Sequence, residues 1–281
     1  MDVERFTDQY EVTAALHGCT PEDLRRRDRD RALPLRRWLA FRGGDAVGAV
    51  TAWLRPDDRM FLDFACRNPA AYGPLTEAAA EALRCRLHTL VDAAAGDAVA
   101  ALEAAGFETE LVQERFRIRF DRALALVDRA WVPRGFGVRR ADEVEEERLF
   151  ALDNALRRDT PGTDGWQGDR RWFHDELAEA PPFDPRAYLV AIDEGGGEYV
   201  GLARIWRNPA GPRFGLLGVL RRYRSTSIAA ALLKQALTAA SRWGHPTFTT
   251  ETSPVNRVVY PRMQRLGAES LGRSLQLVRR G

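Results

Sequence analysis

The chain has 281 residues, of which 45% are hydrophobic, and its formal net charge is +2. This length suits one large domain or two of ordinary size with a substantial hydrophobic core. The balanced charge argues against a protein that binds nucleic acid through a broad basic surface. No apolar run reaches membrane-spanning length, and the N-terminus is acidic rather than signal-like. We therefore expect a cytoplasmic protein without a nucleic-acid or membrane partner.

The three cysteines, Cys19, Cys66 and Cys85, show neither a close pair nor the spacing of a metal site. This pattern is typical of reduced thiols in the cytosol. No cluster of histidine and cysteine and no Ser-His-Asp arrangement is visible in the sequence. We therefore expect no bound metal.

The first half of the chain predicts helices followed by an antiparallel meander. Residues 1–31 are expected to be mostly helical, since Thr20 can cap a helix and Pro21 suits its first turn. Three strands separated by compact turns follow, and then a helix, a strand, a helix and a strand. The expected ranges are 36–41, 46–54 and 60–65 for the three strands, then 74–83, 87–91, 97–104 and 112–120.

The second half predicts a similar order of elements after a connection at residues 123–134, where a Val-Pro-Arg-Gly sequence indicates a turn. A helix expected at 143–157 begins with acidic residues, which the helix dipole favours. The other expected ranges are 136–139, 187–192, 199–206, 214–220 and 247–252 for strands and 169–177 for a second helix.

The stretch after the strand at 214–220 predicts an anion-binding site. Three arginines lie between residues 221 and 224, and a long helix with apolar residues at helical spacing follows. Ser225 or Thr226 can cap this helix. Free backbone N–H groups and the positive end of the helix dipole attract anions, so a phosphate or pyrophosphate is the expected ligand. A plain strand–helix turn with solvated arginines is the alternative.

The segment Arg224-Ser-Thr-Ser227-Ile-Ala229 resembles the R/Q-x-x-G-x-G/A loop of the GNAT acyltransferases, and Asn256 followed by Leu266-Gly267 resembles a later landmark of that family. The resemblance covers the second half and implies acetyl-CoA or another acyl-CoA as cosubstrate, with its pyrophosphate at the helix start. Ser227 departs from the usual glycine, and Met263 stands where the family often has an acid tyrosine. The cofactor-binding residues that the resemblance implies are Leu217, Gly218, Val219, Arg224, Ser225, Thr226, Ser227, Ile228, Ala229 and Asn256.

The repeated order of elements indicates two similar halves. We expect an α/β fold (α+β, with mixed sheets) of two GNAT-like domains, each a mostly antiparallel mixed sheet flanked by helices. The expected bounds are 1–122 and 135–281, with a linker at 123–134. Because the first half lacks the R-x-x-G-x-G sequence at its corresponding helix start, we expect a degenerate copy that serves as a scaffold. A second ligand site in that half is the alternative.

In the GNAT plan, the segment between the first two helices of the domain forms part of the wall for the acceptor. Here Asp159 and Asp164 could attract a cationic amine, and Trp166 could give it an aromatic face. An ordinary surface turn with aspartate caps explains the same residues equally simply.

Acyl transfer to an amine needs a base, a donor for the oxyanion and stabilisation of the leaving thiolate. Glu251 is the candidate base, because the end of its strand lies beside the cleft in the GNAT fold; a solvent-facing residue is the alternative. Tyr260 lies one helical turn before Met263 and is the candidate acid; a packed tyrosine is the alternative. Backbone N–H groups near Val219 are the expected oxyanion donors.

These features predict an acyl-CoA-dependent N-acyltransferase that transfers an acetyl group to a primary amine of a small molecule or peptide, by direct attack on the thioester. The alternative is a non-catalytic acyl-CoA-binding or interaction protein with a GNAT-like fold. The sequence identifies neither the acceptor nor the acyl group, and it leaves open whether the chain forms a homodimer.

Overall fold

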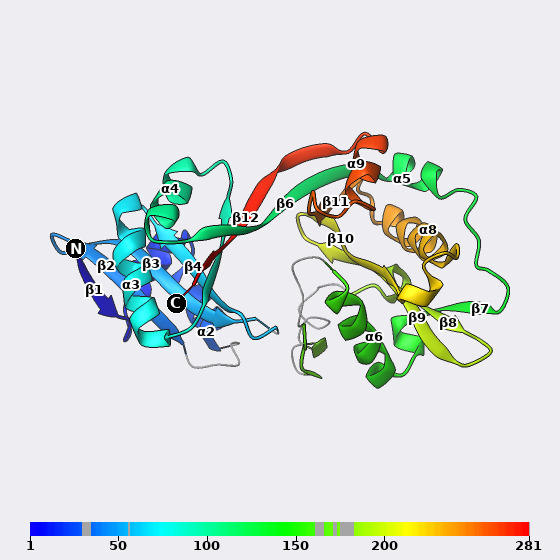
Figure 1. Ribbon diagram of the computed structural model, residues 1–281, viewed down its shortest axis with the longest axis horizontal. Helices are drawn as coiled ribbons and strands as arrows, with labels where there is room; N and C mark the ends of the chain where they lie inside the picture. The colour runs from blue at the N-terminus through cyan, green and yellow to red at the C-terminus, as the bar shows by residue number, and fades with distance from the viewer. Residues whose placement is uncertain (30–34, 56, 161–165, 171–172, 175–182, 281) are drawn as a thin grey trace. The chain divides into compact units, whose positions relative to one another are not determined.

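A computed structural model describes the protein at residues 1–29, 35–55, 57–160, 166–170, 173–174 and 183–280. The chain forms two compact units, Met1–Gln113 with Gly272–Gly281 and Glu114–Leu271 (Figure 1). Each unit is a mostly antiparallel mixed sheet with helices packed on it, so the predicted fold class is confirmed.

The strands of the first unit follow the order β1-β2-β3-β4-β5-β12. Neighbours pair antiparallel except β4 and β5, which run parallel. The two helices expected in residues 1–31 are present, but the segment also contains β1, which was not predicted and pairs with β2. The elements are β1 (Asp2–Arg5), α1 (Tyr10–His17), α2 (Pro21–Arg29), β2 (Arg36–Arg42), β3 (Asp45–Leu54), β4 (Met60–Cys66), η1 (Pro69–Ala71), α3 (Tyr72–Leu83), β5 (Leu87–Asp92), α4 (Gly96–Ala104) and β12 (Glu269–Arg279).

The strands of the second unit follow the order β6-β11-β10-β9-β8-β7, and only β10 and β11 pair in parallel. The predicted helix at 169–177 lies largely outside the described residues. The elements are β6 (Glu108–Arg119), α5 (Phe120–Leu126), β7 (Phe136–Arg140), η2 (Ala141–Glu143), α6 (Glu146–Arg158), η3 (Pro185–Ala187), β8 (Tyr188–Asp193), β9 (Glu198–Asn208), β10 (Gly211–Val219), η4 (Arg221–Tyr223), α8 (Ile228–Ala240), η5 (Ser241–Trp243), β11 (Thr247–Thr252) and α9 (Tyr260–Arg265).

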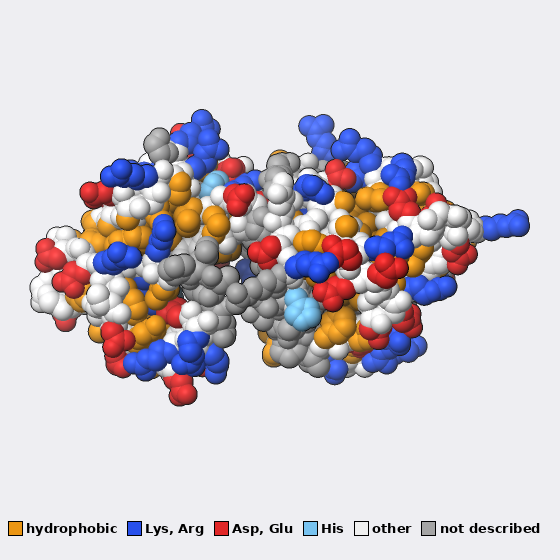
Figure 2. Space-filling view, turned by 90° about the horizontal axis from the view of Figure 1, so that it is seen from below, with side chains coloured by type: hydrophobic (Ala, Val, Ile, Leu, Met, Phe, Trp, Pro, Cys, Tyr) orange, Lys and Arg blue, Asp and Glu red, His pale blue; other side chains and the backbone are white. Residues whose placement is uncertain are grey.

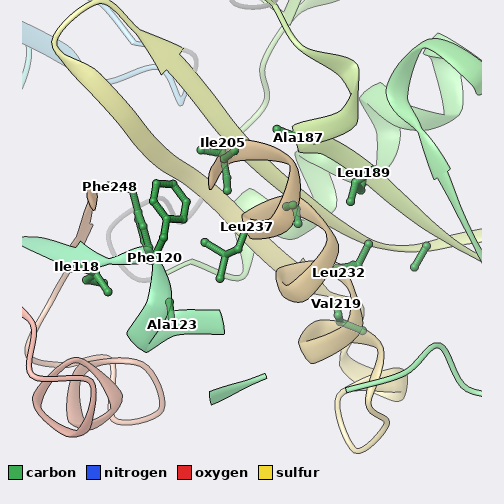
Figure 3. Close-up of a cluster of buried hydrophobic side chains, with 14 of the residues drawn as sticks. Ile118, Phe120, Ala123, Ala187, Leu189, Ile205, Val219, Leu232, Leu237 and Phe248 are labelled. Carbon is green, nitrogen blue, oxygen red and sulfur yellow. The ribbon is translucent and has the colours of Figure 1, made fainter. Parts of the chain in front are cut away.

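The sheet of the second unit separates two clusters of buried side chains. One cluster packs against α8 and includes Ile205, Leu232 and Leu237; Figure 3 shows it along that helix. The other packs against α6 and includes Leu152 and Leu202. Side chains alternate between the two faces of a strand, so neighbouring residues of β9 contribute to different clusters. Full burial of a leucine contributes about 1.5–3 kcal/mol, and these clusters therefore fix α6 and α8 on opposite faces.

Two long strands complete the sheets from distant parts of the chain. The second half of β6 pairs with β11, from Glu114 opposite Thr252 to Arg119 opposite Thr247. The end of β12 pairs with β5 in the first unit. The compact units therefore differ in extent from the domains expected at 1–122 and 135–281, since the last ten residues of the chain belong to the first unit.

No helix among the described residues has both the length and the apolar character needed to cross a membrane. Acidic and basic side chains are intermixed on the face seen in Figure 2, in keeping with the small net charge.

Candidate active site

The two parallel strands of the second unit diverge soon after they meet. β10 and β11 pair only at Arg213 and Thr249, whereas β10 stays paired with β9 as far as Val219. An irregularity between Phe214 and Leu216 accompanies the divergence. At Gly215 a Cβ atom would lie 2.5 Å from Nε1 of Trp206, so only glycine fits this bulge without a shift of the indole. Beyond Arg213, the divergence leaves this edge of β10 without a paired strand.

Backbone groups of β10 are directed to this unpaired edge. The N–H of Leu220 donates to the carbonyl of Val200 at 2.8 Å, which fixes the register of β10 against β9. Because alternate residues of a strand direct their backbone groups to the same edge, Leu217 and Val219 direct theirs away from β9. The carbonyl of Val219 accepts from Nε of Arg224 at 3.1 Å on that side. The N–H of Leu217 can therefore donate to a carbonyl oxygen placed at this unpaired edge.

The start of α8 forms a cradle of backbone donors at the end of β10. The N-cap is Ser227 rather than the expected Ser225 or Thr226, and its side chain makes no capping hydrogen bond. The hydroxyl of Thr226 accepts from the N–H of Ile228 at 3.4 Å instead. Within the described part of the chain, the backbone N–H groups of Ser225, Ser227 and Ala229 have no acceptor. These donors and the helix dipole together favour an anion.

Ser227 turns its side chain away from the donors of its own loop. Its hydroxyl donates to the backbone carbonyl of Trp131 at 3.1 Å. The residue that replaces the usual glycine is therefore held by the segment before β7, and its backbone N–H stays available to a ligand.

All three arginines of the loop have acidic partners. Nη2 of Arg224 lies 2.8 Å from Oδ2 of Asp159, and Nη2 of Arg221 lies 3.3 Å from Oδ1 of the same carboxylate. Arg222 pairs with Glu198, and the hydrogen bond from Arg222 holds the pKa of that carboxyl below its ordinary value. The structure thus places Asp159, expected on the acceptor wall, against the arginines of the loop between β10 and α8.

The other two residues expected on the acceptor wall have different outcomes. Asp164 lies outside the described residues. Trp166 is buried, with only 4% of its surface exposed, and the guanidinium of Arg157 lies 4.8 Å from its ring centroid. The face of this indole is therefore already covered by a cation of the protein itself.

A buried ionic group on the α6 side was not predicted from the sequence. Asp153 is 1% exposed and accepts from Nε of Arg157 at 2.6 Å, while Nη1 of Arg204 lies 3.9 Å away. Arg204 pairs with Leu216 across β9 and β10 and stacks over Trp206 at 4.2 Å. The sequence did contain an indication of this buried ionic group. Asp153 falls on the apolar face of its helix, where a buried charge needs a partner.

Glu251 lies two residues beyond the last pairing of β10 with β11. Its side chain is 35% exposed, and Oε2 lies 3.6 Å from Nη2 of Arg213. Phe248 belongs to the cluster on the α8 face, so alternation along β11 puts Glu251 on the α6 face. Its position beside the diverging strands is compatible with a role on the acceptor side.

Tyr260 is connected to a carboxylate that the sequence reasoning missed. Its hydroxyl donates to Oε2 of Glu114 at 2.8 Å, and Glu114 is only 6% exposed. Met263 is 8% exposed and packs in the hydrophobic cluster on the α8 face. Glu114 could not be found from local spacing, since it lies on β6, 146 residues before Tyr260.

Asn256 shapes the turn between β11 and α9. Its side-chain oxygen accepts from the N–H groups of Val258 and Val259 at 3.3 and 3.1 Å. Val255 and Val258, on either side of Asn256, are each 64% exposed. Among the described residues, no group of three or more His, Cys, Asp or Glu side chains has the arrangement of a metal site.

Comparison with known proteins agrees with this geometry. Residues 149–268 match the model of the Acetyltransferase (GNAT) family. A GCN5-related N-acetyltransferase from Sphaerobacter thermophilus superposes with a TM-score of 0.69 at 18% identity, over 99% of this chain and 95% of its own. A tandem GNAT protein of the clavulanic acid biosynthesis pathway gives a TM-score of 0.70 at 17% identity, over 99% and 98% of the two chains.

Residues 149–268 thus match the GNAT acetyltransferase family, and the whole chain shares the fold of tandem GNAT proteins. The family model covers the diverging strands, the donor cradle and α9, all of which lie in the second unit. For the first unit, the likeness to the GNAT proteins is one of fold. The comparison with curated proteins gave no match.

Proposed function

We propose that this GNAT protein is an acetyl-CoA-dependent N-acetyltransferase that acts on a primary amine of a small molecule or peptide. The observation that supports this most is the divergence of β10 from β11 directly before the donor cradle. An acyl-CoA needs both features, since its diphosphate requires donors and its thioester arm requires an open channel lined by backbone groups. Both lie within the segment that matches the family model.

The cradle is proposed to hold the diphosphate of the cofactor. The N–H groups of Ser225, Ser227 and Ala229 would donate to its oxygens, with the helix dipole adding attraction. The thioester arm would follow the open edge of β10 as an added strand, with hydrogen bonds to Leu217 and Val219. Asn256 and the exposed Val255 lie on the loop after β11 and would contact the arm from the other side.

Glu251 is proposed as the base for the acceptor. An alkyl amine has a pKa near 10, so it is protonated at neutral pH and must lose one proton before it can attack. The carboxylate would take that proton, directly or through one water. The amine nitrogen then bonds to the thioester carbon, and the N–H of Leu217 stabilises the oxyanion. The C–S bond breaks and the nitrogen loses its second proton to solvent, which gives the neutral amide and the thiolate. Arg213, 3.6 Å from Glu251, orients the carboxylate.

Tyr260 is proposed as the donor for the leaving thiolate. The hydroxyl of Tyr260 donates its proton in a hydrogen bond to Glu114. A hydrogen bond to a charged group is worth about 1.5–3 kcal/mol, so transfer of this proton to the thiolate requires about that much free energy to break the bond. A thiol has a pKa near 8.5 and can also leave as the thiolate near neutral pH. We therefore expect Tyr260→Phe to lower kcat by no more than about 100-fold.

Thiol release measured with acetyl-CoA and a panel of primary amines tests the proposed function. Acetylated product and free thiol in equal amounts are expected for at least one amine. Thermal stabilisation by acetyl-CoA without turnover of any amine would instead favour a non-catalytic acyl-CoA-binding protein. Absence of both would refute the proposal.

A further inference from the structure

The segment between α5 and β7, residues 127–134, is fixed along the start of α8; we refer to it as the connector (Figure 1). The hydroxyl of Ser227 donates to the carbonyl of Trp131 at 3.1 Å. Lys234, the only lysine of the chain, donates to the carbonyl of Ala130 at 3.4 Å and also to that of Asp128. Ser227 and Lys234 lie two helical turns apart, so the connector follows the first half of α8 closely.

Trp131 presents its indole to solvent from this fixed backbone. The residue is 68% exposed, the largest exposed fraction among the large hydrophobic residues of the described chain. Its ring makes no aromatic, cation–π or hydrogen-bonding contact with another described residue. An indole has an extended apolar face, and an exposed one beside a cofactor site is suited to stack on a flat ring.

Ser227 connects the connector to the proposed diphosphate site. Its backbone N–H belongs to the donor cradle, whereas its hydroxyl holds the residue that carries the indole. The group attached directly to the diphosphate of CoA is a 3′-phosphorylated adenosine. A diphosphate on the cradle would therefore bring the adenine ring within reach of Trp131.

We propose that the connector binds the 3′-phosphoadenosine of CoA, with Trp131 stacked on adenine and Arg129 and Arg134 attracting the 3′-phosphate. This rests on the proposed function and assigns part of cofactor recognition to a segment outside the GNAT sheet. Both arginines are exposed and lie within three residues of Trp131 in the connector. The planar guanidinium of arginine suits a phosphate, and stacking on an aromatic ring suits any base. The serine in place of glycine then has a role, because its hydroxyl holds the platform.

Isothermal titration of the full-length protein with CoA, 3′-dephospho-CoA and 4′-phosphopantetheine tests the proposal. Trp131→Ala is expected to weaken CoA binding about tenfold, as loss of one base stack predicts, while Trp131→Phe keeps most of the affinity. The double variant Arg129→Gln, Arg134→Gln is expected to bind CoA and dephospho-CoA with equal affinity, whereas the wild type prefers CoA. Phosphopantetheine, which lacks adenine, is expected to bind all these variants equally.

Leu126→Ala is the control, because this residue of α5 is 57% exposed and precedes the connector directly. Its affinity for CoA is expected to equal that of the wild type. Wild-type affinity of Trp131→Ala for CoA would overturn the proposal, as would equal weakening of phosphopantetheine, which would indicate a disturbed cradle. Failure of the wild type to bind CoA would refute the proposed function itself and is thus a different outcome.

Discussion

Asp159→Asn is expected to tighten the binding of CoA. The carboxylate of Asp159 accepts from Arg224 at 2.8 Å and from Arg221 at 3.3 Å, and its side chain is 31% exposed. If the cradle holds the diphosphate as we propose, this carboxylate is an internal anion that competes with it for the same two arginines. The substitution keeps the shape of the side chain and removes its charge.

Coulomb's law gives the order of magnitude of this change. At roughly 7 Å through water, two unit charges interact by about 0.6 kcal/mol, so Asp159 opposes a diphosphate of about two charges by about 1.2 kcal/mol. Salt screening reduces this value, and we expect an affinity for CoA that is about three- to sevenfold higher in the variant. The lost ion pairs are partly exposed and together contribute about 1–2 kcal/mol or less, so the fold should persist.

Isothermal titration with CoA at low and at moderate salt measures the effect, which should shrink as salt rises. Asp142→Asn is the matched control, since Asp142 forms a similarly exposed pair with Arg140 at 3.2 Å in the same unit. If Asp159 instead binds the acceptor, the variant would raise the KM for the amine and leave CoA affinity unchanged. That result, in a variant that unfolds at the wild-type temperature, would refute the competition described here.

Three further predictions concern the base, the first unit and the last strand. Glu251→Gln is expected to lower kcat at least 100-fold and to leave the affinity for acetyl-CoA unchanged. The control variant Glu269→Gln, which removes one partner of a similarly exposed ion pair, should keep the wild-type rate. A wild-type rate for Glu251→Gln would show that Glu251 is not the base. Burial lowers the pKa of His88, so below about pH 6.5 the unfolded chain binds a proton that the native chain does not. The free energy of unfolding measured in urea should therefore decline as the pH falls below about 6.5, and His88→Gln should reduce this decline. A chain that ends at Leu271 lacks the residues that pair with β5, so hydrogen exchange in β5 should lose its protection; wild-type protection would show that β12 is dispensable there.

The features predicted well from the sequence are those with local signals. Apolar periodicity located α8, and the loop before it showed a helix start with donors, arginines and small residues. The strands of the meander were found because Gly- and Asp-containing turns separate them. Each of these signals lies within a few residues of the element that it predicts.

The features that were missed depend on contacts between distant residues. Asp159 pairs with Arg224, which lies 65 residues later in the sequence. Nothing in the sequence near either residue indicates that the two meet. Glu114 became a neighbour of Tyr260 only because β6 pairs with β11. The pairing of β12 with β5 was equally invisible, since a strand has the same alternating pattern whichever sheet it joins.

A structure of the protein crystallised with acetyl-CoA tests the central claim most directly. We predict the diphosphate oxygens within hydrogen-bonding distance of the backbone nitrogens of Ser225, Ser227 and Ala229, and the thioester where β10 leaves β11. A cofactor found only in the first unit, or none in crystals grown at saturating acetyl-CoA, would contradict this account.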